Sequence, residues 1–151
     1  MILKQFLFSF ISTVGFSVFF NAPRSSLLYA GFTGGCGWVV YYILKSMGYA
    51  APFASLAGAI VVGLLGELFA RIDKKPVTAF VVPGIVPLVP GYGMYLAMVG
   101  LINNDYAVAI QIGTETILTG GAIAMGIIIV SSLAKIFKSH KTIILHSMKK
   151  R

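Results

Sequence analysis

Pro83-Gly84-Ile85-Val86-Pro87-Leu88-Val89-Pro90-Gly91 is the stretch of this sequence that decides its fold. Three prolines and two glycines fall within it, and it lies in the longest run of the chain that carries no charged residue. Each proline removes a backbone N–H donor and clashes with the preceding helical turn. In a bilayer, freed backbone groups are tolerated only where protein or a water-filled cavity covers them. We therefore expect a helix that is broken at membrane depth and whose backbone lines a path for a polar molecule.

Composition places the whole chain in a membrane. Apolar residues make up 58% of its 151 residues and charged residues only 11%, whereas a soluble domain carries about 25% charged residues. The few charges separate five uncharged runs, each as long as the ~17–25 residues that a spanning helix needs. We predict an all-α, polytopic membrane helix bundle of about five spans with a Pro/Gly-broken fourth span. The spans are expected near residues 3–21, 25–44, 50–70, 77–102 and 114–137 of a membrane domain over 1–137, followed by a basic cytoplasmic tail over 138–151.

The basic residues are distributed unevenly between the two sides of such a bundle. With five spans, ten of the twelve lysines and arginines fall on one side, and only Lys4 and Lys45 fall on the other. The positive-inside rule puts the ten in the cytoplasm, so the N-terminus is expected outside and the C-terminus inside. The net charge of +8 is then an orientation and lipid-contact signal rather than a nucleic-acid footprint.

The fourth run allows two interpretations. As one straight helix, residues 76–104 would measure roughly 43 Å at ~1.5 Å per residue, which exceeds a hydrocarbon core of about 30 Å. A kinked helix with its prolines on one inward face is one solution. An unwound or re-entrant centre over Pro83–Gly91, with arms over Val77–Val82 and Tyr92–Ile102, is the other and the one we favour. Candidate substrate-binding residues here are Pro83, Gly84, Pro87, Pro90 and Gly91, with Tyr92 and Tyr95 offering hydroxyls just after the break.

Few other polar residues are candidates for binding. Asn21 and Arg24 form a turn, where Arg24 is either a cytoplasmic anchor or a cation that meets an anionic substrate. Glu67 either pairs with Arg71 one turn later or is a proton-coupling site at membrane depth. Glu115 either complements the dipole of a helix that Thr114 caps or couples protons at the outer entrance. Residues 106–113 would then be a separate interfacial piece.

Small residues predict close helix contacts. Gly31 and Gly35 lie one turn apart in the second run, and Ala59 and Gly63 have the same spacing in the third. Without a hydrophobic drive in lipid, such faces are how helices associate. They indicate contacts within the bundle or with another chain, as a hetero- or homo-oligomer.

The sequence offers few residues for metal binding, cofactor binding or catalysis. Cys36 is the only cysteine, and His140 and His146 lie in the tail without acidic or thiol neighbours. We therefore predict no metal, no cofactor, no catalytic residue and no enzymatic activity.

Several of these features together resemble a known family. Val14-Gly15-Phe16, the Phe20–Arg24 turn, the glycine-rich Ala30–Trp38 stretch and above all Pro83–Gly91 followed by Tyr95 and Met98 look like the small YjjB-type subunit of the threonine/serine exporter (ThrE) family. The similarity covers nearly the whole chain in order.

The resemblance implies an architecture, a partner and substrates that the residues alone do not indicate. In single-chain members a cytosolic domain precedes two membrane halves of about five spans each, and this chain resembles the second, smaller half. A separate YjjP-like subunit with a cytosolic domain would supply the rest. The implied activity is export of small hydrophilic metabolites across the bacterial plasma (inner) membrane, driven by the proton-motive force. Threonine, serine and, for some two-chain members, small dicarboxylic acids are the implied substrates.

Two functions of different classes remain open from the sequence. The chain is either a transport subunit that contributes half of a substrate path or a non-transporting scaffold that assembles a partner.

Overall fold

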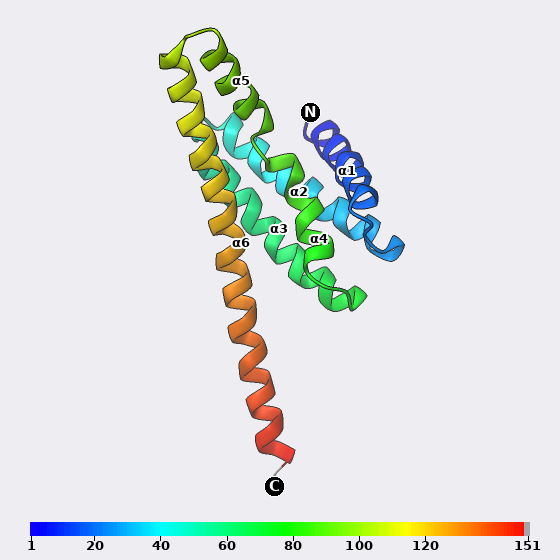
Figure 1. Ribbon diagram of the computed structural model, residues 1–151. Helices are drawn as coiled ribbons and strands as arrows, with labels where there is room; N and C mark the ends of the chain where they lie inside the picture. Colours follow the sequence, from blue (N-terminus) through cyan, green and yellow to red (C-terminus); the bar gives the residue numbers. More distant parts are fainter. Residues whose placement is uncertain (150–151) are drawn as a thin grey trace.

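The chain folds into helices throughout. A computed structural model describes the backbone of residues 1–149 and the side chains of residues 1–136. Within the described residues there is no strand, which confirms the all-α prediction. In chain order the elements are α1 (Ile2–Phe19), the 3-10 turn η1 (Arg24–Ser26), α2 (Leu27–Ser46), α3 (Ala51–Asp73), α4 (Thr78–Ile85), the 3-10 turn η2 (Val86–Leu88), α5 (Gly91–Ile102) and α6 (Tyr106–Lys149) (Figure 1).

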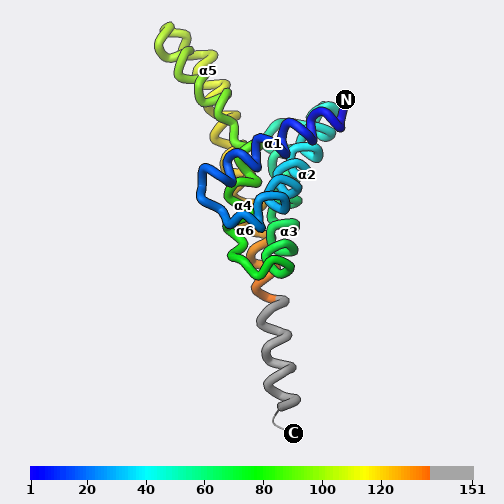
Figure 2. Tube along the Cα trace, turned by 90° about the vertical axis from the view of Figure 1, so that its right-hand side faces the viewer, coloured from blue at the N-terminus to red at the C-terminus, as the bar shows by residue number. Residues whose placement is uncertain are grey.

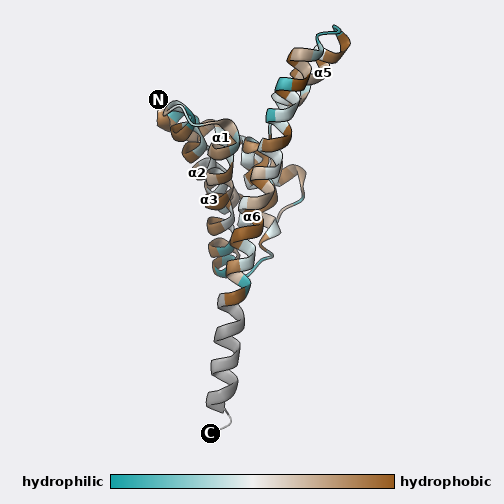
Figure 3. Ribbon diagram, turned by 90° about the vertical axis from the view of Figure 1, so that its left-hand side faces the viewer, coloured by the Kyte–Doolittle hydropathy of each residue, from teal (hydrophilic) through white to brown (hydrophobic). Residues whose placement is uncertain are grey.

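Long apolar helices account for most of the spans. Four helices are each long and apolar enough to cross a membrane, namely Ile2–Phe19, Arg24–Ser46, Ala51–Asp73 and Tyr106–Ile136. Thr78–Leu88 and Gly91–Ile102 form a bent pair that gives a fifth span if the two cross as one. Many large apolar side chains of these helices are exposed, and Figure 3 shows hydrophobic residues along the length of the helices. Such a surface suits hydrocarbon rather than water.

Helix ends alternate between two ends of the bundle. The α1–α2 turn, the α3–α4 turn and the C-terminal part of α6 lie at one end in Figure 1, and the N-terminus, the α2–α3 turn and the α5–α6 turn lie at the other. Arg24 and Lys74 lie in the turns at the first end, and Lys45 lies near the turn at the second. The predicted tail over 138–151, with His140 and His146, has its side chains outside the described residues.

Three turns close through residues with a left-handed backbone. Asn21, Lys74 and Asn104 have φ values of 55°, 53° and 58°. At Asn21 the next amide, of Ala22, donates to the carbonyl of Ser17 at 2.9 Å. That 6→1 bond satisfies a carbonyl that the end of a helix otherwise leaves free. Asparagine suits the position because it tolerates this conformation better than most residues.

Glycines bring α1, α2 and α3 close together. A Cβ on Gly31 would lie 2.8 Å from Phe10 of α1, and one on Gly35 would lie 2.7 Å from Phe6, so both predicted contacts of the second run are made by α1. Between α2 and α3 the approach is backbone to backbone, because a Cβ on Gly58 would lie 2.9 Å from the carbonyl oxygen of Gly37. Val62 of α3 and Leu88 of η2 pack beside this contact, and they share a buried cluster with Val81 of α4 and Ile123 of α6.

The broken fourth span differs in detail from the prediction. Helix α4 continues through Pro83 to Ile85, and Pro87 lies near the start of η2, where a missing N–H costs little. Only Val89 and Pro90 lie outside helices, and the axes of the two parts meet at 47°. The predicted unwound centre over the whole of Pro83–Gly91 is therefore wrong. Val89 adopts extended φ and ψ angles of −62° and 127°, which proline imposes on the residue that precedes it.

The predicted start of the last helix is also wrong. Thr114 does not cap a helix, because α6 begins at Tyr106 and the Thr114 hydroxyl donates to the carbonyl of Ile110 at 2.7 Å in mid-helix. Asp105 is the cap instead, since its Oδ1 accepts from the amide of Val108 at 3.2 Å. Residues 106–113 are consequently the first two turns of α6 rather than a separate interfacial piece.

Helix α5 leaves the bundle together with the start of α6. In Figure 2 these two segments form an arm that diverges from α1, α2 and α3, and Figure 3 shows the same divergence from the opposite side. The divergence opens a wedge between this arm and the end of α2 with the start of α3, and residues of all four helices line a cavity there.

Candidate functional site

A cavity of about 430 Å³ lies in this wedge, next to the break in the fourth span. Its lining comes from helices α2, α3, α5 and α6, from the turn η2, and from Val89 and Pro90 at the break. Its size falls within the ~300–1,000 Å³ typical of small-molecule sites. Its walls are mostly apolar, with polar groups on three sides.

The break supplies backbone donors. Gly91 donates its amide hydrogen to the carbonyl of Val89 at 2.8 Å, and Met94 donates to Pro90 at 3.1 Å. The amides of Tyr92 and Gly93, which lie between them in the first turn of α5, have no backbone acceptor among the described residues. Both residues line the cavity. The amino end of α5, which carries the positive end of the helix dipole, therefore borders the cavity.

Helix α6 supplies acceptors. Glu115, Thr116 and Thr119 line the cavity from this helix. The two threonine hydroxyls donate to the carbonyls of Ile112 and Glu115 in the preceding turn, each at 2.7 Å. A hydroxyl whose hydrogen is committed in this way still has lone pairs to accept a hydrogen bond. Glu115 adds two carboxylate oxygens, so this wall consists of acceptors.

Helix α3 supplies a hydroxyl without a partner. Ser55 is fully buried at the cavity wall, and its Oγ makes no hydrogen bond to any part of the chain that the structure describes. Burying an unpaired hydroxyl costs about 1–3 kcal/mol, and native proteins contain few such groups. Ser55 could bond to a carbonyl of its own helix, as Thr116 and Thr119 do, but it does not.

Helix α2 closes the cavity with aromatic rings and one cation. Trp38 and Tyr41 stack with their ring centroids 5.0 Å apart. The Trp38 Nε1–H donates to the Oε1 of Gln5 in α1 at 2.8 Å, which fixes the orientation of the indole. Lys45 lines the same cavity near the end of α2 and is exposed.

The residues that the sequence singled out divide into two groups. Pro87, Pro90, Tyr92 and Glu115 line the cavity. The others lie outside its lining. Pro83 is fully buried, and Gly84 packs within α4, where a Cβ would lie 3.0 Å from Thr33 and 3.1 Å from Val62. Gly91 lies beside the cavity with open space around its Cα, and Tyr95 is 64% exposed.

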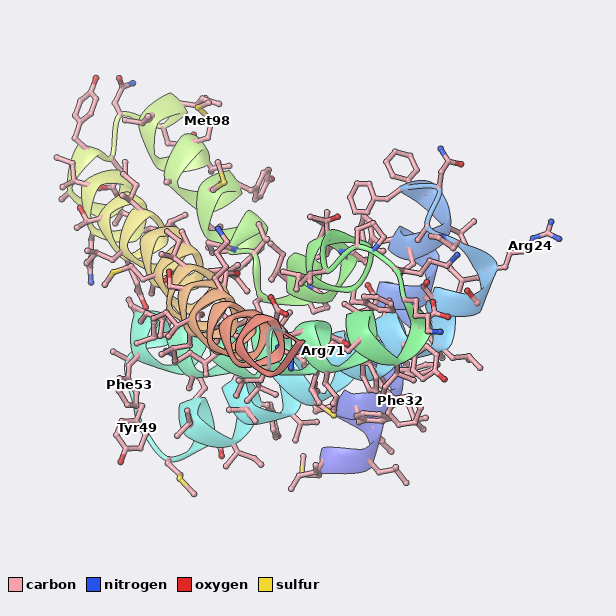
Figure 4. All side chains as sticks on the ribbon, turned by 90° about the horizontal axis from the view of Figure 1, so that it is seen from below. Arg24, Phe32, Tyr49, Phe53, Arg71 and Met98 are labelled. Carbon is pink, nitrogen blue, oxygen red and sulfur yellow. The ribbon has the colours of Figure 1, made fainter. Side chains whose placement is uncertain are left out.

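The polar candidates at the other end of the bundle do not reach the cavity. Asn21 is exposed in its left-handed turn, and Arg24 extends away from the bundle (Figure 4). Glu67 lies half-buried on α3, about 18 Å along the helix from Ser55 at ~1.5 Å per residue. At that end the carboxylate of Asp73 accepts hydrogen bonds from the hydroxyls of Ser25 at 3.1 Å and Ser26 at 2.6 Å.

Sequence reasoning missed Ser55, Gly93 and Lys45 as members of the site. One signal for Ser55 is present, because it is the only serine or threonine of α3. Gly93 lets α5 and α6 approach closely, since a Cβ there would collide with Thr116 Oγ1. No group of three or more potential metal-binding side chains occurs in the residues that the structure describes.

Comparison with known proteins assigns the family. The family model described as "Threonine/Serine exporter, ThrE" matches residues 5–133. The chain belongs to this threonine/serine exporter family. Family membership and the long apolar helices together make it a multi-pass membrane protein.

One related protein matches part of this chain. The chain is 31% identical over 102 residues to a protein of Haemophilus influenzae (strain ATCC 51907 / DSM 11121 / KW20 / Rd) described as "Uncharacterized protein". That match covers 68% of this chain but only 34% of the relative, so the chain spans about a third of the relative's length. No solved structure matches.

Proposed function

We propose that the chain forms half of the substrate path of a secondary exporter for small hydrophilic metabolites, either threonine/serine-type amino acids or small dicarboxylates. The cavity beside Val89 and Pro90 is its substrate site, and alternating access exposes this site to each side of the membrane in turn. The observation that carries the proposal is the coincidence of the break, two unpaired amides, an unpaired buried hydroxyl and a carboxylate around one cavity. Broken helices in transporters use freed backbone groups in this way.

Proton coupling falls to a carboxylate in this proposal. Glu115 is the better placed of the two candidates, because it lines the cavity and its charge would respond to a bound substrate. Glu67, nearer the opposite end of α3, is the second candidate. Asn21 and Arg24 would meet substrate only at the mouth of the path, at the end that the positive-inside rule assigns to the cytoplasm.

A separate subunit completes the path. The partner is a YjjP-like membrane subunit with a cytosolic domain. Open surface on α6 favours a partner, because a Cβ on Gly120 or Gly121 would meet nothing within 4 Å. The proposed location is the bacterial inner membrane, with the N-terminus outside and the C-terminus in the cytoplasm.

Scaffolding is the second candidate function. The same open glycines would serve a chain that only holds a partner in place, because small residues on a lipid-facing surface promote helix association. In that case the cavity would be incidental.

Reconstitution into lipid vesicles separates the two functions. Flux of labelled serine is measured for the co-expressed pair, for each chain alone, and for pairs that carry Pro87→Ala or Tyr92→Phe. The transport proposal expects flux only from the pair, reduced by both variants while the complex still forms. Tyr49→Phe is the matched control, because Tyr49 is an exposed tyrosine of the α2–α3 turn outside the cavity. Full flux without this chain would establish the scaffold instead.

A further inference from the structure

The cavity has an exposed mouth and a buried base. Lys45 and Glu115 line it and are exposed. Ser55 and Thr119 line the same cavity but are only 0% and 4% exposed. Thr119 lies one turn after Glu115 on α6, and Lys45 lies in the last turn of α2, just before the α2–α3 turn. The mouth therefore faces the end of the bundle that the proposed orientation puts outside the cell (Figure 1).

Lys45 and Glu115 lie at about the same level on opposite walls of the mouth. Helices α3 and α6 both start at this end of the bundle, and a Cβ on Gly126 of α6 would lie 2.9 Å from that of Ala59 of α3. Continued towards the mouth, this register brings Glu115 level with the α2–α3 turn, which closely follows Lys45. Among the described residues of the lining, these two are the only base and the only acid. Both side chains are described, and no salt bridge joins them.

Two flexible points connect the arm of α5 and the start of α6 to the bundle. Val89 and Pro90 interrupt the fourth span where α5 begins. Gly120 and Gly121 form a pair within α6, and a Cβ on either would meet nothing within 4 Å. Two further apolar cavities are each lined by Val89, Pro90 and Gly120, so the break and the glycine pair are neighbours in space. Glycine pairs and interrupted segments are where helices bend.

We propose that this arm is a lid. It swings about Val89–Pro90 and Gly120–Gly121 and closes the mouth of the cavity by bringing the carboxylate of Glu115 onto the ammonium of Lys45. The structure then shows the lid open. This inference rests on the proposed function, because it names the part of the chain that closes the outer end during alternating access.

The opposite end of the bundle is already closed. Ser25 and Ser26 donate to Asp73 at 3.1 Å and 2.6 Å, which ties the α1–α2 turn to the end of α3. Phe80 of α4 is fully buried near this end, in a cluster with residues of α2 and α3. Movement of the lid alone would therefore seal the cavity and exclude water from it, as closing segments do in other proteins.

An ion pair across the mouth suits a lid that must reopen. A solvent-exposed pair between lysine and glutamate contributes only a factor of about two to five to an equilibrium. Such a pair biases the lid towards the closed form without locking it, since a much larger factor is needed to make one of two states exclusive.

Quenching of Trp38 fluorescence by acrylamide tests the pair. Trp38 is the only tryptophan of the chain and lines the cavity, and acrylamide is uncharged, so nearby charges do not attract or repel it. The full chain in lipid nanodiscs is compared with Lys45→Glu, with Glu115→Lys and with the double variant. Each single reversal places like charges across the mouth and should raise the quenching constant about twofold. The double variant restores the pair and should return the constant to its native value.

Lys75→Glu is the control for charge reversal, because Lys75 is exposed and lies outside the cavity lining. It should leave the quenching constant unchanged. Circular dichroism checks that each variant remains helical.

Stiffening α6 tests the hinge. Gly120→Ala combined with Gly121→Ala favours a straight helix without a clash, so the lid should stay open as it is in the structure. Quenching of Trp38 should rise about twofold, as it does when the pair is lost, and adding Lys45→Glu should then change nothing. Gly15→Ala is the matched control, because Gly15 is a helical glycine with equally open surroundings on α1, outside the arm. In that background Lys45→Glu should keep its full effect.

The outcomes separate this inference from the proposed function. A double charge reversal that is quenched as strongly as the single ones, or a full effect of Lys45→Glu in the stiffened chain, would overturn the lid. Vesicle flux that still falls with Pro87→Ala and Tyr92→Phe would then support the cavity as the substrate site without it. Restored quenching in the double variant, with flux unaffected by those two substitutions, would support the lid and overturn the proposed substrate path.

Discussion

The fourth span contains the same dipeptide twice, in opposite surroundings. Pro83-Gly84 is buried, and a Cβ added to Gly84 would lie only 3.0 Å from Thr33 and 3.1 Å from Val62. Pro90-Gly91 stands at the cavity, and Gly91 has no neighbouring atom within 4 Å of a Cβ position. The difference teaches that proline and glycine do not by themselves make a site. The site forms where the chain also turns away from its neighbours.

Packing partners explain why the two copies differ. Helix α4 lies against α2 and α3, which hold Pro83 within a helix despite its missing donor. Helix α5 departs at 47° and packs mainly on α6. Figure 2 shows this departure. The cavity lies beside it, and the unpaired amides of Tyr92 and Gly93 in α5 border the cavity.

The largest effect is expected from adding the same side chain to each glycine of the two dipeptides. Gly84→Val places new carbons against Thr33 and Val62 and should lower the free energy of unfolding by about 3 kcal/mol, as overpacking does. Gly91→Val has open space and should change it by less than about 1 kcal/mol. Thermal unfolding followed by circular dichroism in nanodiscs measures both. Equal destabilisation would show that the second dipeptide is packed like the first.

Two fully buried serines should respond in opposite directions to the loss of their hydroxyls. Ser26→Ala removes the 2.6 Å bond to Asp73 at the packed end and should cost about 1–2 kcal/mol of unfolding free energy. Ser55→Ala removes an unpaired hydroxyl at the cavity and should leave the chain as stable or more stable by up to about 1 kcal/mol. Thermal unfolding of the two variants in nanodiscs measures both changes. Destabilisation by Ser55→Ala of the same size as by Ser26→Ala would mean that Ser55 is paired within the folded chain.

A smaller effect is expected from the α2 wall of the cavity. Gln5→Leu removes the acceptor of the Trp38 indole and should cost about 1 kcal/mol of stability. The emission of Trp38 should shift because the ring loses its fixed orientation. Gln111→Leu is the matched control, because Gln111 is exposed on α6 and lies outside the cavity lining. An unchanged Trp38 spectrum in Gln5→Leu would show that α1 does not position this wall.

Much of the fold was predictable because spans leave a direct trace in composition. The uncharged runs located every long helix, and the spacing of Gly31 and Gly35 predicted a close helix contact that α1 makes. Turn chemistry was less informative. Thr114 has the side chain of a cap, yet Asp105 caps α6, because the chain had already turned at Asn104.

The candidate site was predictable only in part. Pro87, Pro90, Tyr92 and Glu115 stand out in the sequence through missing donors, hydroxyls and charge, and they line one cavity. Ser55 does not stand out in this way. Its importance depends on burial without a partner, which arises only when α3 packs beside the diverging α5 and α6.

Thiol labelling of two adjacent positions on α6 tests the central claim. The claim is that the cavity beside Val89 and Pro90 holds water and a polar substrate. Thr119 is 4% exposed and lines the cavity, whereas Leu118 is 58% exposed and lies outside its lining. Each is replaced by cysteine in a Cys36→Ala chain in lipid vesicles, and the rate of reaction with a charged methanethiosulfonate reagent is measured from both sides. Because thiolate forms in water and not in hydrocarbon, Thr119→Cys should react about tenfold or more faster than Leu118→Cys, and serine should slow it. A faster reaction at Leu118→Cys, with Thr119→Cys inert, would contradict the account.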